Sequence, residues 1–93
     1  AALLGGDYSA DERLAAFLLN LSERFADRGY SATRLHLMMP RADIANYLRL
    51  APETVSRVLR RFQDDGLIEV DKREVAITSV DRLKHLARCV LQQ

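Results

Sequence analysis

The segment Leu50–Phe62, LAPETVSRVLRRF, constrains the fold most, because its apolar and polar residues separate cleanly only on a helix. At about 100° per residue, the apolar side chains gather on one side and the polar ones on the other. The apolar side holds Val55, Val58, Leu59 and Phe62, and the polar side holds Glu53, Ser56, Arg57, Arg60 and Arg61. Pro52 suits the first helical position, where its missing N–H costs nothing. The pattern predicts a helix from about Pro52 to Asp64 with one buried face.

The residues before this helix predict three further elements. Ser9 and Glu12 form a capping-box pattern at the start of a helix over about Ala10–Arg28, and Gly29 suits its end. Its inward positions are Leu14, Phe17, Leu18, Leu21 and Phe25. RLHLMM, Arg34–Met39, alternates weakly and indicates a short strand. A second helix is expected over about Arg41–Leu48, with Ile44, Tyr47 and Leu48 facing inward, followed by a tight turn at Arg49–Ala51.

The residues after Gly66 predict a hairpin and a last helix. Leu67–Thr78 holds two short Val- and Ile-rich segments around a charged tip. Because the tip has no glycine, we expect a loop of a few residues rather than a type I′ turn. Ser79 is expected to cap a helix from about Val80 to Leu91. Its inward positions are Val80, Leu83, Leu86, Ala87 and Val90.

Length and composition indicate one globular domain. The chain has 93 residues, of which 48% are hydrophobic and 29% charged. The element order predicts a mainly α fold with a small β-hairpin wing, which is a winged helix-turn-helix. The net charge is only +1, but residues 41–63 hold five arginines against two acids. The basic charge is therefore concentrated around the helix-turn-helix.

The polar face of the Pro52–Asp64 helix has the chemistry of a surface that reads DNA. Arg57 can donate two hydrogen bonds to guanine, Glu53 can accept from a cytosine amino group, and Ser56 allows close approach. Arg60 and Arg61 suit phosphates, which dominate affinity. Lys72 and Arg73 at the wing tip suit either phosphates or plain solvation. The other reading of the helix is a surface helix whose charges only solvate it.

Other chemistries lack the residues they need. His36, His85 and the single cysteine, Cys89, have no metal-ligand spacing, and one cysteine allows no internal disulfide. No catalytic triad motif or Gly-rich phosphate loop is present, so we do not expect an enzyme. No apolar run approaches the roughly 20 residues of a membrane span. The rival function is a winged-helix module that binds proteins without DNA contact, and such a module should lack a basic face.

Two tracts carry a family resemblance. MPRADIANYLRLAPETVSRVLRRFQDDGLIEV and SADERLAAFLLNLSERFADRGYS together resemble the C-terminal DNA-binding domain of the CRP/FNR transcription regulators, especially the FNR branch. The resemblance implies a bacterial regulator that is a homodimer at full length and reads a TTGAT-like half-site with Glu53, Ser56 and Arg57. It also implies contact with RNA polymerase through loop 26–34. The phosphate contacts expected in total are Arg41, Arg49, Thr54, Arg60, Arg61, Lys72 and Arg73.

The resemblance also sets expectations for the rest of the protein. Residues 1–8 are interpreted as the remnant of a linker from a missing effector domain, and residues 9–93 as the DNA-binding domain. No cofactor is expected in these residues; an effector or iron–sulfur cluster, if there is one, belongs to the missing N-terminal domain. Cys89 does not match the cluster cysteines of the FNR branch. Pro40 and Ala51 stand where relatives often have Ser or Thr caps. A cytoplasmic location is expected.

Overall fold

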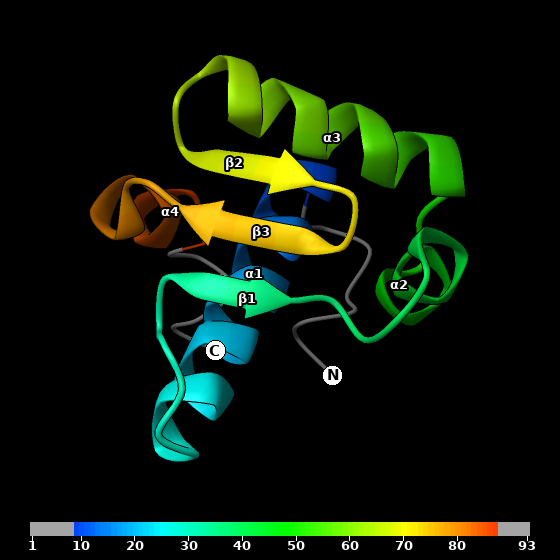
Figure 1. Ribbon diagram of the computed structural model, residues 1–93. Coiled ribbons are helices and arrows are strands. Elements are labelled where there is room, and N and C mark those ends of the chain that lie inside the picture. Colours follow the sequence, from blue (N-terminus) through cyan, green and yellow to red (C-terminus); the bar gives the residue numbers. More distant parts are fainter. Residues whose placement is uncertain (1–8, 88–93) are drawn as a thin grey trace.

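The computed structural model describes residues 9–87, and within them the chain forms four helices and a three-stranded sheet (Figure 1). In chain order the elements are α1 (Ala10–Asp27), β1 (Arg34–His36), α2 (Arg41–Leu48), α3 (Pro52–Asp64), β2 (Ile68–Asp71), β3 (Glu74–Ile77) and α4 (Val80–Leu86). The predicted fold class, mainly α with a hairpin wing, is confirmed. The bounds of α2 and α3 agree with the predicted ones.

Helix α1 begins where its capping box predicts. The Ser9 hydroxyl accepts from the Glu12 N–H (3.2 Å), and a Glu12 carboxylate oxygen accepts from the Ser9 N–H (3.1 Å). The helix ends at Asp27, one residue before the predicted end, and Gly29 follows with a φ of +84°. A glycine adopts that left-handed conformation without the steric cost of a side chain. Both ends of α1 are therefore set by local sequence.

The core forms where the helices face one another and the sheet. The predicted inward face of α3 is confirmed, because Val55, Val58, Leu59 and Phe62 are all buried. In α1, Leu14, Phe17 and Leu18 are buried, while Leu21 and Phe25 pack against the core and remain half-buried. Helix α1 packs against α3 and α4, and α2 packs against α3. Helix α3 is thus held from behind and presents its other face outward.

Strand β1 joins the hairpin as its third strand, a pairing that the sequence pattern does not reveal. The sheet is antiparallel in the order β1-β3-β2, with Leu35 opposite Val75 and Val70 opposite Val75 on the other side. β1 covers only three residues of the predicted Arg34–Met39 segment, although the Leu37 N–H still donates to the Arg73 carbonyl (2.7 Å). The sheet lies with β2 next to α3 (Figure 1).

The hairpin loop is shorter than predicted. Asp71 pairs with Glu74, so only Lys72 and Arg73 form the turn, and Lys72 has a φ of +57°. The expectation of a longer loop is wrong because burial on one face of the sheet sets the register of the strands. Ile68 opposite Ile77 is such a buried pair. The register leaves two residues for the turn, and Lys72 adopts a conformation that glycine usually takes.

Two further side-chain predictions, for Tyr47 and Ser79, differ from the structure. Tyr47 does not face inward: it is 45% exposed, and its ring tilts against that of Phe17 with centroids 5.9 Å apart. Ser79 precedes α4 but makes no side-chain capping hydrogen bond. The inward face predicted for α4 is confirmed within the described residues: Leu83 and Ala87 are buried, and Val80 and Leu86 are half-buried and pack against the core. Residues 88–93, including Val90 and the end predicted at Leu91, lie outside the described part of the chain.

Candidate nucleic-acid interface

The turn between α2 and α3 is built without a glycine. Helix α2 ends at Leu48, and Arg49 takes the left-handed conformation (φ 60°, ψ 45°) that closes the helix. The Arg49 N–H donates to the Asn46 carbonyl, and the Leu50 N–H donates to the Ala45 carbonyl (2.8 Å). Pro52 then opens α3 at a position where no N–H is needed. The predicted tight turn at Arg49–Ala51 is confirmed.

The outward face of α3 carries polar groups without protein partners. Glu53, Ser56, Arg57 and Arg60 are exposed, and none makes a hydrogen bond or ion pair with another residue in the described range 9–87. Glu53 and Arg57 have the i,i+4 spacing of a helical ion pair, yet they do not form one. Thr54 is half-buried at the edge of this face, and Arg49 is exposed just before it. The face is free to meet a ligand.

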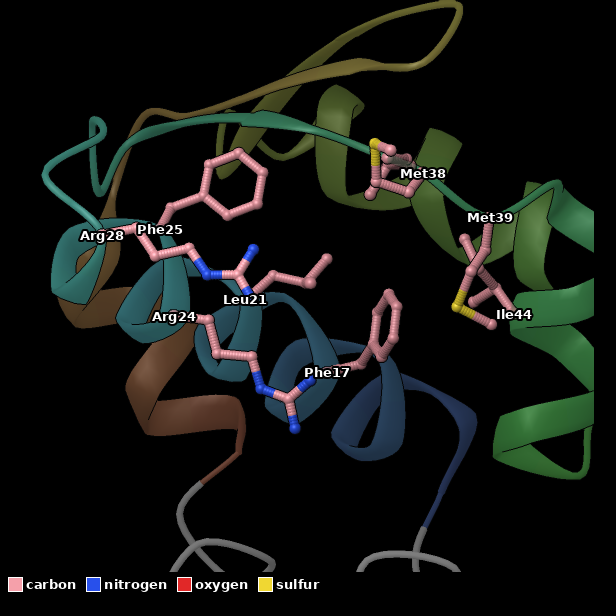
Figure 2. A pocket seen from close by; sticks show the side chains of 9 residues that line it. Phe17, Leu21, Arg24, Phe25, Arg28, Met38, Met39 and Ile44 are labelled. Atoms are coloured by element: carbon pink, nitrogen blue, oxygen red, sulfur yellow. The ribbon is translucent and has the colours of Figure 1, made fainter.

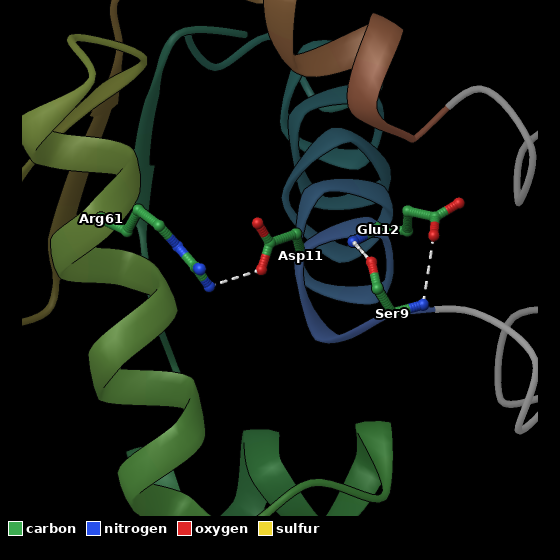
Figure 3. Close-up of polar contacts among 4 residues, drawn as sticks. All are labelled: Ser9, Asp11, Glu12 and Arg61. Carbon is green, nitrogen blue, oxygen red and sulfur yellow. Dashed lines mark hydrogen bonds and ion pairs between the residues drawn. The ribbon is translucent and has the colours of Figure 1, made fainter.

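Arg61 differs from these neighbours. Its guanidinium lies 2.7 Å from the carboxylate of Asp11, in the first turn of α1 (Figure 3). The two side chains are 51% and 32% exposed, respectively. Arg61 was predicted to contact phosphates together with Arg60. That role stays a prediction, but the guanidinium of Arg61 is already in an ion pair with Asp11 in this structure.

The wing tip is tied to the start of α2. Arg41 donates through its guanidinium to the Lys72 carbonyl (2.7 Å). Burial lowers the pKa of Arg41, and the nearby positive charge of Arg73 lowers it further to a smaller extent. Two arginines held close together attract an anion. Arg41 at the start of α2 is thus brought next to the wing turn that contains Lys72 and Arg73.

An open hollow of about 380 Å³ lies between α2, α3 and the wing. Arg41, Ser56 and Arg60 contribute its polar lining. Gln63 and Val70 also line the hollow and link α3 to β2, because the Gln63 side-chain oxygen accepts a hydrogen bond from the Val70 N–H (2.9 Å). The hollow therefore places predicted base-reading and phosphate-contacting residues side by side.

Sequence reasoning missed one functional candidate, Arg13. Its side chain is buried (8% exposed) and donates to the Leu48 carbonyl at the end of α2 (3.2 Å). The signal was present, because Arg13 precedes Phe17 by four residues and so belongs to an apolar stripe of α1. His36, whose sequence position gave it no metal-ligand spacing, pairs with Glu74 across β1 and β3.

A second surface lies away from α3. An apolar groove of about 240 Å³ runs between α1 and the segment that joins β1 to α2 (Figure 2). Phe17, Leu21 and Phe25 form one wall and Met38 and Met39 the other, with Arg24 and Arg28 on the α1 side. Met38 is 76% exposed. Exposed apolar surface of this kind is typical of protein contacts.

Two other kinds of site were sought among the same residues. No group of three or more His, Cys, Asp or Glu residues within 9–87 is arranged to hold a metal ion. No helix in the described part is long and apolar enough to cross a membrane.

Helix α3 has an exposed, arginine-rich face; α2 and a tight turn precede it, and a β wing follows it. This arrangement defines a winged helix-turn-helix domain of the class that binds DNA. The Crp-like helix-turn-helix domain family matches residues 12–86, and the chain belongs to that family. It is a domain of the kind found in FNR-type transcription regulators.

Similar proteins agree with this assignment. The chain is 56% identical over 75 residues to the transcriptional activator protein FnrA of Stutzerimonas stutzeri, covering 81% of this chain and 31% of FnrA. It is 49% identical over 85 residues to the fumarate and nitrate reduction regulatory protein of Escherichia coli K12, covering 91% and 34%. The structure of FixK2 from Bradyrhizobium japonicum superposes with a TM-score of 0.80 at 36% identity, covering 90% and 41%.

The chain spans about a third of the length of these curated relatives. They are regulators of transcription, not enzymes. The FNR branch expected from the sequence is confirmed.

Proposed function

We propose that this chain is the sequence-specific DNA-binding domain of a bacterial transcription regulator and inserts α3 into the major groove of a TTGAT-like half-site. One observation carries the proposal: Glu53, Ser56, Arg57 and Arg60 are exposed on one face without partners among the described residues, opposite a fully buried stripe. The i,i+4 spacing of Glu53 and Arg57 would allow an ion pair, and without one both side chains remain available to base edges.

Glu53, Ser56 and Arg57 are the proposed base readers. They lie in the N-terminal half of α3, the part of a recognition helix that faces base edges. Arg57 would donate to guanine O6 and N7, and Glu53 would accept from a cytosine amino group. Ser56 leaves room for the groove wall. One acid among arginines is tolerable here because a base amino group balances it.

The proposed phosphate contacts surround this centre. Arg60 follows on α3, Arg49 and Thr54 flank its start, and Arg41 sits with the wing tip. The closeness of Arg41 and Arg73 supports this role, because a phosphate between them would relieve their repulsion. Lys72, the other wing-tip residue, adds a third charge. Arg61 was also expected here, but its ion pair with Asp11 suggests a different role, argued below.

Two further partners belong to the proposal. The full-length protein is expected to bind a palindrome as a homodimer in the cytoplasm, with recognition helices about 34 Å apart. RNA polymerase is expected at loop 26–34, where Tyr30 is 65% exposed and its ring tilts against that of Phe25, which lines the apolar groove. A module that binds only proteins is the alternative function, and the groove would serve it. The unpaired face of α3 favours DNA.

A titration tests the proposal. Fluorescence anisotropy would compare a duplex bearing one TTGAT half-site with a scrambled duplex of equal composition at several salt concentrations. We expect the half-site to bind more tightly and both affinities to fall with salt. A wild-type chain that binds both duplexes equally, or neither, would favour the protein-binding alternative.

A spacing experiment tests assembly. Fusing the chain to a dimerising coiled coil should raise affinity for a full palindrome far more than for a half-site, through avidity. Inserting about five base pairs, half a helical turn, between the half-sites should remove most of the gain. Tight binding by the unfused chain, insensitive to spacing, would contradict the expected dependence on a separate dimer element.

A further inference from the structure

We propose that the first turn of α1 positions the recognition helix: Asp11 and Arg13 set how α3 lies on DNA without touching DNA themselves. The inference rests on the proposed function. Its basis is a pair of contacts from residues two positions apart on α1. The Arg13 contact reaches the end of α2 just before the turn, and the Asp11 contact reaches Arg61 in the last turn of α3.

The Arg13 contact holds the turn that leads into α3. The Leu48 carbonyl belongs to the last turn of α2, whose final carbonyls lack helical partners. Arg13 donates to it from a buried position, with a positive charge at the negative end of the helix. The turn that follows contains no glycine and places Arg49 in a left-handed conformation. A buried, directional contact at this point restricts where α3 can begin.

The Asp11 contact holds the other end of α3. Asp11 accepts from Arg61 at 2.7 Å across the gap between α1 and α3 (Figure 3). Both groups are exposed enough that such a pair contributes little to stability. The contact does, however, have a definite direction and lies on the edge of the exposed face. Its effect should therefore fall on the orientation of α3 rather than on folding.

The polar contacts at the two ends of the helix-turn-helix add directional restraints to the packing of the buried stripe of α3. The hydrophobic driving force is non-directional, so the packing of Val55 and Phe62 restricts the rotation of α3 through shape alone, and directional polar contacts can restrict it further. Bidentate base contacts require side chains within about 0.5 Å of the productive geometry. Polar ties at both ends, together with the Gln63–Val70 contact on the wing side, would restrict that rotation. A loss of these ties should reduce discrimination between DNA sequences more than overall affinity.

A double-mutant cycle tests the Asp11–Arg61 contact. Wild type, Asp11→Asn, Arg61→Gln and the double variant would be titrated with the TTGAT and scrambled duplexes at several salt concentrations. Each single variant should lower the ratio of the two affinities about threefold, and the double variant should lower it no further, because coupled residues are not additive. The salt dependence of Arg61→Gln should match that of wild type.

Two control variants separate positioning from charge. Asp27→Asn makes the same charge change at the far end of α1, in an exposed residue, and should leave the affinity ratio unchanged. Arg60→Gln removes a proposed phosphate contact and should weaken both duplexes alike, with a salt slope flatter by about one. If Arg61→Gln behaves like Arg60→Gln, or Asp11→Asn like Asp27→Asn, Arg61 is not positioned by Asp11 and the proposal fails.

A conservative pair tests Arg13. Arg13→Met fills similar space without a donor, whereas Arg13→Lys keeps a charged donor. Below the unfolding transition of each variant, Arg13→Met should lose about tenfold in the affinity ratio, the size of one hydrogen bond to a charged group. Arg13→Lys should recover most of it. Equal ratios in wild type and Arg13→Met would overturn the role of Arg13.

The outcomes remain separable when a variant does not fold. If Arg13→Met is unfolded, Arg13→Lys and the Asp11–Arg61 cycle still decide: unchanged ratios in all of them overturn the proposal. A wild type without preference for TTGAT would instead refute the proposed function itself, and the positioning role with it. A wild type that discriminates, combined with variants that discriminate equally well, refutes only the positioning role.

Discussion

Helices α1 and α3 are both amphipathic, yet they use their polar side chains in opposite ways. The polar residues in the first turn of α1 are engaged within the protein: they close the helix end or bind α2 and α3. On the outward face of α3, no such contact is made with any other described residue by Glu53, Ser56, Arg57 or Arg60. The same kinds of residue therefore stabilise the fold in one helix and remain available for a ligand in the other.

The helix starts differ in the same sense. Ser9 and Glu12 satisfy backbone N–H groups at the start of α1. The N-cap residues of α2 and α3 are Pro40 and Ala51, which provide no side-chain capping hydrogen bond. Unsatisfied N–H groups at a helix start attract anions. The starts of α2 and α3 therefore lack the side-chain cap of α1, as does the start of α4, and such starts leave backbone N–H groups open to an anion.

The largest effect should come from the one part of α3 that resembles α1, its buried face. Phe62 is only 1% exposed, and Phe62→Ala should lower the free energy of unfolding by about 3–5 kcal/mol. Urea denaturation would measure the loss. Arg57→Ala is the matched control on the outward face and should change stability by less than about 0.5 kcal/mol. Similar losses in both variants would abolish the distinction between the two faces.

The next effect should appear only with DNA. Arg57→Ala should cost about 1–3 kcal/mol of discrimination between the TTGAT and scrambled duplexes, the value of one bidentate base contact. Arg60→Ala should weaken both duplexes alike and flatten the salt dependence. Anisotropy titrations would measure both. If the two variants lost the same affinity on both duplexes, the division between base readers and phosphate contacts along α3 would be wrong.

Much of the fold could be predicted from sequence because its signals are local. The bounds of α2 and α3 and the buried stripe of α3 follow from helical periodicity and from Pro52. The pairing of β1 with β3 could not be predicted, because it joins residues about forty positions apart. The two-residue wing turn could not be predicted either, because it depends on the register of the sheet. Tyr47 looked buried by spacing alone, but its ring lies at the surface against Phe17.

The candidate site shows the same limit. Periodicity brought Glu53, Ser56 and Arg57 to one face, but it could not show that Arg61 meets Asp11, fifty residues away. Nor could it show that Arg13 binds the Leu48 carbonyl, since that contact depends on how α1 crosses α2. Local patterns predict which face a residue occupies. They do not predict which residue, distant in the sequence, that side chain contacts in the fold.

A smaller effect should come from the capped start of α1. Ser9→Ala removes the hydroxyl that accepts from the Glu12 N–H and should lower the free energy of unfolding by about 1 kcal/mol. Ser31→Ala removes another exposed serine hydroxyl, one that accepts loop N–H groups rather than capping a helix, and should cost less. Thermal unfolding would compare them. Discrimination between duplexes should be unchanged in Ser9→Ala; a loss there would mean that the cap also orients the base readers.

The smallest effect should come from giving α3 the kind of cap that α1 has. Ala51 already has the extended conformation of an N-cap residue (φ −73°, ψ 146°), so Ala51→Ser should fit without strain. Its hydroxyl can accept from a free N–H in the first turn. The gain should be about 0.5 kcal/mol, at the lower end of capping effects. It should be small because the Thr54 N–H already donates to the Ala51 carbonyl (3.0 Å).

Differential scanning calorimetry of Ala51→Ser would measure this as a rise in melting temperature of about 2–4 °C for a domain of this size. Ala42→Ser, at an exposed position inside the first turn of α2 rather than at its cap, is the matched control and should give no rise. Affinity for the TTGAT duplex should change by less than about threefold, since a serine hydroxyl can itself donate to a phosphate. A variant with no gain would show that the start of α3 is already satisfied in the free protein. The contrast with α1 would then rest on the side chains of the outward face alone.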